Sequence, residues 1–522
     1  MCRCGAAVAV ATTTTTTGAA VRTGTHRTRD RRRDRRARRT TTTTTTMKAS
    51  TDGGAREDTS GRRRARVAVI GAGAAGLAAI RACEVEGHTV VAFELANDVG
   101  GTWRYESEVE DDEGEGASAA PDDGRRAKVH GSMYASLRTN LPRELMGFGE
   151  FPFHESHGVD ERRFCGHEEV QRYLQAYAET FGLRERVTFN AKVTSVERVV
   201  REDAEAERAW SSQWAVKSSI DGGAARREVF DAVIVANGHY SEPRVPRFKG
   251  ALTWPGRQVH SHNYRTPDGF EGKTVLLIGA MASGEDISRE IASVADRVLL
   301  SARTWQNPEW ATSVEGVGAQ GNIYRKPNVA SFSPDGSVEF EDGSVEHRVD
   351  ICMYCTGYRY EFPFLSRDVG VAVVDNFVAP LYEHCVAVDA PSLSFIGLPW
   401  KVVPFPMFEI QSRWIARMLS GAVPMPSRED MVTFAAQLES TLEPHGGVPR
   451  RHAHCFGDKQ WEYNARIASM SDGPGLESWR EQMYIATGKN KRANPETYRD
   501  AHMSDAEALA AALDEFTKVA TR

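Results

Sequence analysis

The 522-residue sequence lacks several features that would place a protein in a narrow class. No uncharged apolar run approaches the roughly 18–20 residues of a membrane-spanning helix, so we expect no transmembrane segment. Eight cysteines scattered over this length favour free thiols in a reducing compartment over a disulfide framework. The net charge of −6 gives no bias toward nucleic acid as a partner. No nucleophile triad, metal-ligand cluster or paired carboxylates are evident, so we predict no metal site.

The first sixty residues are poor in the apolar side chains that a folded core requires. Two threonine tracts, Thr12–Thr17 and Thr40–Thr46, flank an arginine-rich stretch. Such a segment buries too little apolar surface to offset chain entropy, so residues 1–60 are expected to be a disordered tail. Residues 1–46 also have the Arg-rich, acid-poor composition of a plastid or mitochondrial transit peptide; alternatively, the protein starts at Met47. We therefore expect a cytoplasmic protein, or a plastid or mitochondrial one if residues 1–46 are a transit peptide.

One local pattern occurs twice, about two hundred residues apart. The turns Gly71–Gly76 and Gly279–Gly284 each follow a short apolar run and precede a helix-like segment. A strand, a glycine turn and a helix in this order bring a pyrophosphate to a helix N-terminus. Two copies predict an α/β protein with two Rossmann-like, dinucleotide-binding domains. They also suggest electron transfer between a flavin and a nicotinamide.

In the first copy each glycine has its own task. Gly71 permits the tight turn, Gly73 lets phosphates approach the backbone, and Gly76 lets helix and strand pack closely. Glu94 ends the next expected strand, where its carboxylate can accept hydrogen bonds from ribose hydroxyls, as in FAD. A Gly-Gly pair at 100–101 permits a further close approach beside Trp103. The predicted FAD-binding residues are Gly71, Ala72, Gly73, Ala74, Ala75, Gly76, Glu94, Gly101, Thr102 and Trp103.

The second copy differs at two points. Met281 takes the place of the middle glycine, so the backbone approaches a pyrophosphate less easily. The next expected strand ends in Arg303, where the first copy has an acid, and a cation there can pair with a 2′-phosphate. The contrast predicts FAD in the first unit and NADPH in the second. The predicted NADPH-binding residues of this unit are Gly279, Ala280, Met281, Ala282, Ser283, Gly284 and Arg303.

Hydrophobic periodicity predicts the other elements and the domain limits. Helices are expected over residues 74–86, 163–181, 409–419 and 505–518, strands over 67–70, 89–94, 187–189, 213–217, 229–235, 273–278, 297–303 and 352–355, and a hairpin over 338–349. An acidic loop insertion is expected over residues 106–123. The FAD domain is expected to be discontinuous, with parts at 61–240 and 346–445, and with the NADPH domain, 241–345, inserted between them. Residues 446–522 form a C-terminal extension that reads as polar and irregular before its last helix.

The segment between the two turns resembles a known family. Trp254 and Gly256, followed by the spaced His260 and Tyr264-Arg265, resemble the identifying motif of flavin-containing monooxygenases. Asn237–Pro243 resembles that family's domain linker, and Cys355–Tyr358 resembles the Thr-Gly-Tyr segment where the chain crosses back between domains. Ser136–Glu144 resembles the segment with the family's active-site Asn. Leu393–Arg413 resembles the plant branch of the family, which includes S-oxygenating members. The resemblance covers roughly residues 65–445.

The resemblance implies a reaction cycle. NADPH reduces FAD, and O2 then forms a C4a-hydroperoxide on the flavin. This species oxygenates a small-molecule soft nucleophile, a thioether or an amine, as in N,N-dimethylaniline monooxygenase activity. The resemblance implies that Asn140 is the catalytic residue, with Thr139, Thr356 and Gly357 also at the cofactors. His260 and Tyr264 are expected to shape the seam between the domains.

Three alternatives remain open on the sequence alone. Cys352 and Cys355 have the spacing of a redox pair, as in a pyridine-nucleotide disulfide reductase, although both lie in an expected buried strand. A Baeyer–Villiger or N-hydroxylating flavin monooxygenase would use the same cofactors. A non-catalytic flavoprotein would bind FAD without oxidising NADPH. The substrate and the oligomeric state are not readable from these motifs.

Overall fold

The computed structural model describes residues 56–57, 62–110, 131–199, 212–501 and 505–520. Nearly all of the expected N-terminal tail lies outside these residues, as does most of the expected acidic insertion. Within the described residues, no helix combines the length and the apolar character needed to cross a bilayer.

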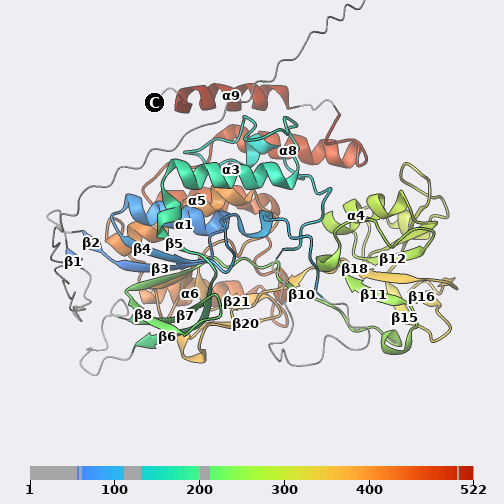
Figure 1. Ribbon diagram of the computed structural model, residues 1–522, viewed down its shortest axis with the longest axis horizontal. Coiled ribbons are helices and arrows are strands. Elements are labelled where there is room, and N and C mark those ends of the chain that lie inside the picture. The colour runs from blue at the N-terminus through green and yellow to red at the C-terminus, as the bar shows by residue number, and fades with distance from the viewer. Residues whose placement is uncertain (1–55, 58–61, 111–130, 200–211, 502–504, 521–522) are drawn as a thin grey trace, which may run out of the picture. The chain divides into compact units, whose positions relative to one another are not determined.

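A seven-stranded sheet forms the first of two α/β units (Figure 1). Its strands, in spatial order, are β22 (Leu381–Tyr382), β23 (Val386–Ala387), β24 (Leu393–Phe395), β9 (Ala232–Val235), β3 (Arg66–Ile70), β4 (Thr89–Phe93) and β5 (Val187–Thr188). The five strands from β24 to β5 run parallel. The strands β22 to β24 follow the second unit in sequence, so this sheet is built from two separate parts of the chain.

The central strands of this sheet are buried on both faces, which fits their continuous apolar runs. The helices α1 (Ala74–Val85) and α5 (Pro404–Ser420) cover one face, with α3 (His167–Thr180) beyond them (Figure 1). A three-stranded antiparallel sheet covers the other face. Its strands are β6 (Ala191–Val199), β7 (Gln213–Ile220) and β8 (Arg226–Phe230).

A five-stranded parallel sheet forms the second unit. Its strands, in spatial order, are β11 (Arg257–His260), β18 (Ile351–Tyr354), β12 (Thr274–Ile278), β13 (Arg297–Ser301) and β14 (Ile323–Lys326). The helix α4 (Ala282–Ala292) covers one face. The antiparallel strands β15 (Val329–Phe332), β16 (Val338–Phe340) and β17 (Val345–Glu346) pack on the other. The expected hairpin is confirmed by the pairing of β16 with β17.

The two chain crossings between the units lie side by side. The strand β10 (Glu242–Pro243) pairs antiparallel with β19 (Tyr358–Arg359), and the Arg244 N–H donates to Gly357 O at 2.9 Å. Because β18 pairs with both β11 and β12, residues 351–354 belong to the second sheet. The expected boundary after residue 345 therefore falls inside the second unit, and the chain returns at β19.

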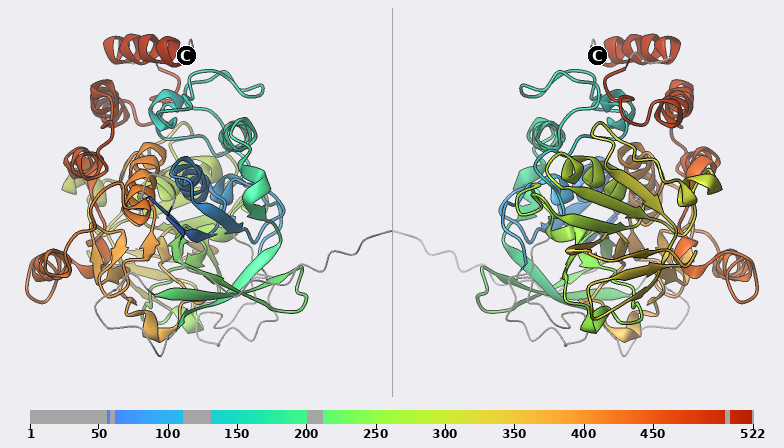
Figure 2. Two further views of the ribbon diagram at one scale, coloured as in Figure 1. Left: turned by 90° about the vertical axis from the view of Figure 1, so that its left-hand side faces the viewer. Right: turned by 90° about the vertical axis from the view of Figure 1, so that its right-hand side faces the viewer.

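The chain beyond residue 445 is not irregular, contrary to expectation. It forms α7 (Gln460–Met470), α8 (Ser478–Ala493) and α9 (Ala506–Ala520), after the earlier α6 (Arg428–Ser440). These helices, coloured orange to red, follow one another along one side of the first unit (Figure 2). Trp479 and Met483 of α8, Phe516 of α9 and Leu145 of the short helix α2 (Arg143–Met146) share one buried apolar cluster. The extension thus covers the segment that follows Asn140.

Candidate cofactor and active site

The first glycine turn has a backbone that excludes side chains at its two ends. Gly71 has φ +103°, and a Cβ there would lie 2.5 Å from Ala236 O. A Cβ on Gly76 would lie 2.0 Å from Gly71 O, so the helix can approach the strand only with glycine there. Gly73 precedes α1 as its N-cap and provides no side-chain cap for the first N–H groups of the helix. These groups are suited to a phosphate.

A second loop folds against this turn. The Gly100 N–H donates to Ala72 O at 3.0 Å, and a Cβ on Gly101 would lie 2.8 Å from Gly73 Cα. Thr102 follows in the same loop, and Trp103 meets Phe405 of α5 edge to face at 6.2 Å. The predicted residues 71–76 and 101–103 are therefore brought together, with Ala72 and Ala74 buried and Ala75 partly exposed.

Glu94 is fixed at the end of β4 by backbone amides. One carboxylate oxygen accepts from the Ala72 N–H at 2.7 Å, and the other accepts from the Ala96 N–H at 2.8 Å. Burial raises the pKa of Glu94, whereas these N–H donors oppose the rise. The acid thus lies directly against the glycine turn, which is the position that a ribose-binding carboxylate requires.

The second glycine turn repeats the same backbone. Gly279 has φ +112°, with a would-be Cβ 2.3 Å from Cys355 O, and a Cβ on Gly284 would lie 1.8 Å from Gly279 O. Met281 is the N-cap of α4, with φ −91° and ψ −168°, close to the −72° and −172° of Gly73. Because any residue adopts this extended conformation, methionine changes the access to the turn and not its backbone. Ala280 is partly exposed, whereas Met281, Ala282 and Ser283 are exposed.

Arg303 lies two residues beyond the end of β13 and is exposed. It lies within electrostatic range of other cations, because burial and the positive charges of Arg451, Lys401 and Arg303 all lower the pKa of His452. The second strand is thus followed by a cation, Arg303, where the first unit has Glu94. This contrast fits a 2′-phosphate on the second dinucleotide.

The motif between the two turns holds the crossings together. A Cβ on Gly256 would lie 2.1 Å from the buried Trp254 ring, so glycine makes room for that indole. His260 Nδ1 accepts from the His262 N–H, and His260 Nε2 donates to Gly357 O at 3.1 Å. Burial lowers the pKa of His260 to about 4, so its ring is neutral and structural.

Two further motif residues also have structural contacts. The Thr356 hydroxyl donates to Arg244 O across the crossing. The buried Arg265 donates to carbonyl oxygens on both sides of the seam, those of His262 and Glu108 among them. The seam is therefore built from backbone carbonyls and buried donors, and the expectation that His260 shapes it agrees with these contacts.

Asn140 is exposed, and it follows the buried Thr139. The Thr139 N–H donates to Cys165 O at 2.9 Å, and Thr139 O accepts from Arg499 Nε at 3.0 Å. Leu141, the next residue, packs on the core that contains α1. The Asn140 amide is thus held at the surface by fixed neighbours on both sides.

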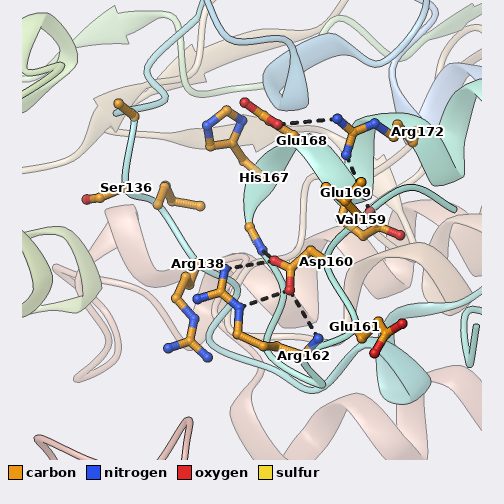
Figure 3. A pocket seen from close by; sticks show the side chains of 13 residues that line it. Ser136, Arg138, Val159, Asp160, Glu161, Arg162, His167, Glu168, Glu169 and Arg172 are labelled. Carbon is orange, nitrogen blue, oxygen red and sulfur yellow. Dashed lines mark hydrogen bonds and ion pairs between the residues drawn. The ribbon is translucent and has the colours of Figure 1, made fainter. Parts of the chain in front are cut away.

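A cavity of about 970 Å³ adjoins this segment (Figure 3). Its lining contains Ser136 and Arg138 together with ionic side chains of the loop 159–162 and of α3. Asp160 accepts from Arg162 at 2.8 Å, and Arg172 faces Glu168 and Glu169, as the dashed lines show. Since a thioether or a tertiary amine favours apolar walls, this ionic cavity is not suited to that part of a substrate.

The cysteine pair is unsuited to redox chemistry. Cys352 lies in β18 and Cys355 directly follows it; both are buried, and both are free. Burial raises the pKa of both thiols, that of Cys355 to about 12. A thiol that stays protonated is a poor nucleophile, so the geometry argues against a disulfide reductase.

The fold and the two turns define a protein that binds two dinucleotides on two Rossmann-type units. Comparisons with known proteins agree. The family model for flavin-binding monooxygenase-like proteins matches residues 64–315 and 313–455. The Arabidopsis thaliana flavin-containing monooxygenase FMO GS-OX-like 4 is 46% identical over 444 residues, which are 84% of this chain and 94% of that protein.

Two solved structures are also similar to this chain. S-allyl-L-cysteine S-oxygenase from Allium sativum has a TM-score of 0.80 and 40% identity, covering 88% of this chain and 99% of that one. Tmm from Pelagibacter sp. strain HTCC7211 has a TM-score of 0.67 and 25% identity, covering 84% and 93%. The chain belongs to the flavin-binding monooxygenase-like family. It is therefore a flavoprotein oxidoreductase of the monooxygenase class, and its two turns fit FAD and NADP.

Proposed function

We propose that the protein is an FAD- and NADPH-dependent monooxygenase that transfers one oxygen atom of O2 to a soft nucleophile. The observation that carries the proposal is the pair of glycine turns with matching backbones and opposite charges, Glu94 beside one and Arg303 after the other. We favour a thioether sulfur over an amine nitrogen, because an S-oxygenase is 40% identical over most of this chain.

The cofactor sites follow from the geometry of the turns. FAD would bind at Gly71–Gly76, with Glu94 on a ribose and residues 101–103 against the rest of the molecule. NADPH would bind at Gly279–Gly284, with Arg303 on the 2′-phosphate. When bound, the flavin supplies the activation of O2, and NADPH supplies the hydride. The crossing strands β10 and β19 would delimit the NADPH domain at about residues 244–357.

The protein's own groups position and protect the reaction. Glu94 is oriented by the Ala72 and Ala96 amides and keeps further lone pairs for ribose hydroxyls. Asn140 presents a neutral amide, which can donate a hydrogen bond to a reacting oxygen without delivering a proton. Thr139, Thr356 and Gly357 would line the cofactors from the Asn140 segment and from the crossing.

A stopped-flow experiment tests the proposal. The full chain is purified with its bound flavin and mixed with NADPH without oxygen; O2 and a thioether, a tertiary amine or a cyclic ketone are then added. We expect NADPH to reduce the flavin, and the thioether to yield a sulfoxide in step with NADPH consumption. A bound flavin that NADPH does not reduce would contradict the proposal. A lactone from the ketone with no sulfoxide would favour a Baeyer–Villiger enzyme instead.

A further inference from the structure

The C-terminal extension contacts two parts of the candidate site at once. The Arg499 guanidinium binds the Asp286 carboxylate of α4 with both Nη atoms, at 3.1 and 2.5 Å. Its Nε donates to Thr139 O at 3.0 Å, directly before Asn140. The Tyr134 hydroxyl, which comes from the segment that leads to Asn140, donates to Asp286 at 3.4 Å. One side chain therefore links the helix of the second unit to the backbone beside Asn140.

The start of α4 has an unusual charge for a helix that receives a phosphate. Glu285 lies in its first turn and Asp286 comes next, whereas α1 has no acidic residue in its first turn. A carboxylate near a helix N-terminus interacts well with the helix dipole, but it repels an anionic ligand at the same place. The helix that would hold the NADPH pyrophosphate thus needs its acids neutralised.

The C-terminal extension supplies two cations to these acids, in addition to Arg289, which pairs with Asp286 inside α4 at 3.4 Å. Lys491 of α8 pairs with Glu285 at 3.0 Å, and Arg499 pairs with Asp286. One turn further along α4, Arg289 pairs with Glu496 at 3.0 Å. Three ion pairs therefore join one face of α4 to the segment 491–499.

The position of Arg499 is set by buried neighbours. Its guanidinium lies 5.0 Å from the centre of the Tyr498 ring, and that ring meets Phe164 edge to face at 5.5 Å. Asn490 Nδ2 donates to Tyr498 O at 3.1 Å, which ties the segment back to α8. The Arg499 side chain is 16% exposed, so its link to Asp286 is screened less than a surface pair.

We propose that the C-terminal extension is part of the NADPH site, in which Lys491 and Arg499 neutralise the acids at the start of α4. Arg499 in addition positions α4 against Thr139, and so against Asn140. This inference rests on the proposed function. It gives a role to residues beyond 455, where the match to the family model ends.

Calorimetric titration of the FAD-loaded full chain with NADP⁺ tests the inference without turnover. Lys491→Ala should raise the Kd for NADP⁺ about two- to fivefold, as the loss of a part-exposed ion pair allows. Arg499→Ala should raise it about tenfold, because a bidentate pair is lost. Both increases should shrink at high ionic strength, and the FAD content should stay unchanged.

The double variant gives the sharper result. Glu285→Gln combined with Lys491→Ala should restore the wild-type Kd or a lower one, since the repelling carboxylate is gone. Both side chains are about a third exposed, so these variants remain informative even if Arg499→Ala folds poorly. Asp500→Ala is the matched control: Asp500 pairs with Arg138 at 2.7 Å, on the Asn140 segment, and should leave the Kd unchanged.

The outcomes separate the two proposals. If the wild-type protein does not bind NADP⁺, the proposed function fails. If it binds NADP⁺ and the Lys491 and Arg499 variants bind equally well, this inference fails alone. It also fails if the double variant stays as weak as Lys491→Ala, because the lysine would then act through folding and not through charge.

Discussion

The two glycine turns have the same backbone and different surroundings. A side chain on the first glycine of either turn would meet the carbonyl of the residue that directly follows the neighbouring strand, and one on the last glycine would meet the carbonyl of the first glycine. The middle positions differ: Gly73 is closed over by the loop at Gly101, whereas Met281 is 55% exposed. Backbone geometry is thus shared by both dinucleotide sites, while access and charge distinguish them. We infer that the first site encloses a resident cofactor and the second admits one that exchanges.

The largest expected effect comes from replacing the last glycine of each turn, because each replacement should abolish binding of a different cofactor. Gly76→Ala places a Cβ 2.0 Å from Gly71 O, and Gly284→Ala places one 1.8 Å from Gly279 O. Overpacking of this kind costs roughly 1–3 kcal/mol or more and displaces the helix N-terminus. Gly76→Ala should abolish FAD retention, whereas Gly284→Ala should keep FAD and lose NADP⁺ binding. Loss of FAD from both variants alike would break the comparison.

A smaller effect is expected from the charge of the second unit. Arg303→Ala should lower kcat/KM for NADPH roughly ten- to hundredfold, the worth of a charge-assisted contact to a phosphate, and leave that for NADH unchanged. Steady-state kinetics with both nucleotides provides the measurement. An unchanged preference for NADPH would remove Arg303 from the site.

Acid should destabilise the fold through its buried histidines, of which His260 lies at the crossing between the two units. Burial lowers the pKa of His260 and of His239 to about 4, and that of His384 to about 3. Because the unfolded chain then binds more protons below its ordinary histidine pKa, the free energy of unfolding should fall as the pH drops from about 6.5 to about 4. Denaturant unfolding across this range measures the slope.

Variants assign part of that slope. His260→Gln keeps an acceptor and a donor but does not titrate, so its stability should fall less steeply with acid. His445→Gln changes an exposed ring and should follow the wild type. Equal slopes for all three proteins would show that His260 does not contribute.

The smallest effect concerns the middle position of the second turn. Met281→Gly should tighten NADP⁺ binding only about two- to fivefold, because the backbone there is already extended and the methionine limits access alone. The matched change Gly73→Met should weaken FAD binding by a much larger factor, since even a Cβ would lie 3.3 Å from Gly101 Cα. Fluorescence titration with each dinucleotide measures the change in Kd that each variant causes. Changes of equal size would show that the middle positions of the two turns are equivalent.

The local pattern of apolar residues and glycines predicted the strands and the helix next to the glycine turns. β3, α1, β4 and β12 begin and end within one or two residues of their expected limits, because apolar runs bounded by glycines have few alternatives. The expected strand 229–235 is instead two strands, β8 and β9. It breaks at Asp231, whose carboxylate accepts from the Arg66 N–H at 2.8 Å.

Contacts between segments that are far apart in the chain could not be predicted from the sequence. Nothing in the order of residues shows that β18 inserts between β11 and β12, so the expected domain boundary fell too early. The helix α8 is mostly polar, with few buried anchors such as Trp479, and such a weak apolar pattern gives little signal. The pairing of Lys491 with Glu285 depends on that packing and could not be foreseen.

The central claim is that one chain binds a resident FAD and an exchanging NADP(H), one at each glycine turn. Nucleotide stoichiometry tests it most directly: the purified wild-type chain is passed through gel filtration and dialysed first against NADP⁺ and then against buffer, and bound FAD and bound NADP⁺ are counted after each step. The account predicts one FAD per chain that survives every step and one NADP⁺ that binds and washes out. Displacement of the flavin by NADP⁺, or retention of a single dinucleotide that competes for both roles, would contradict it.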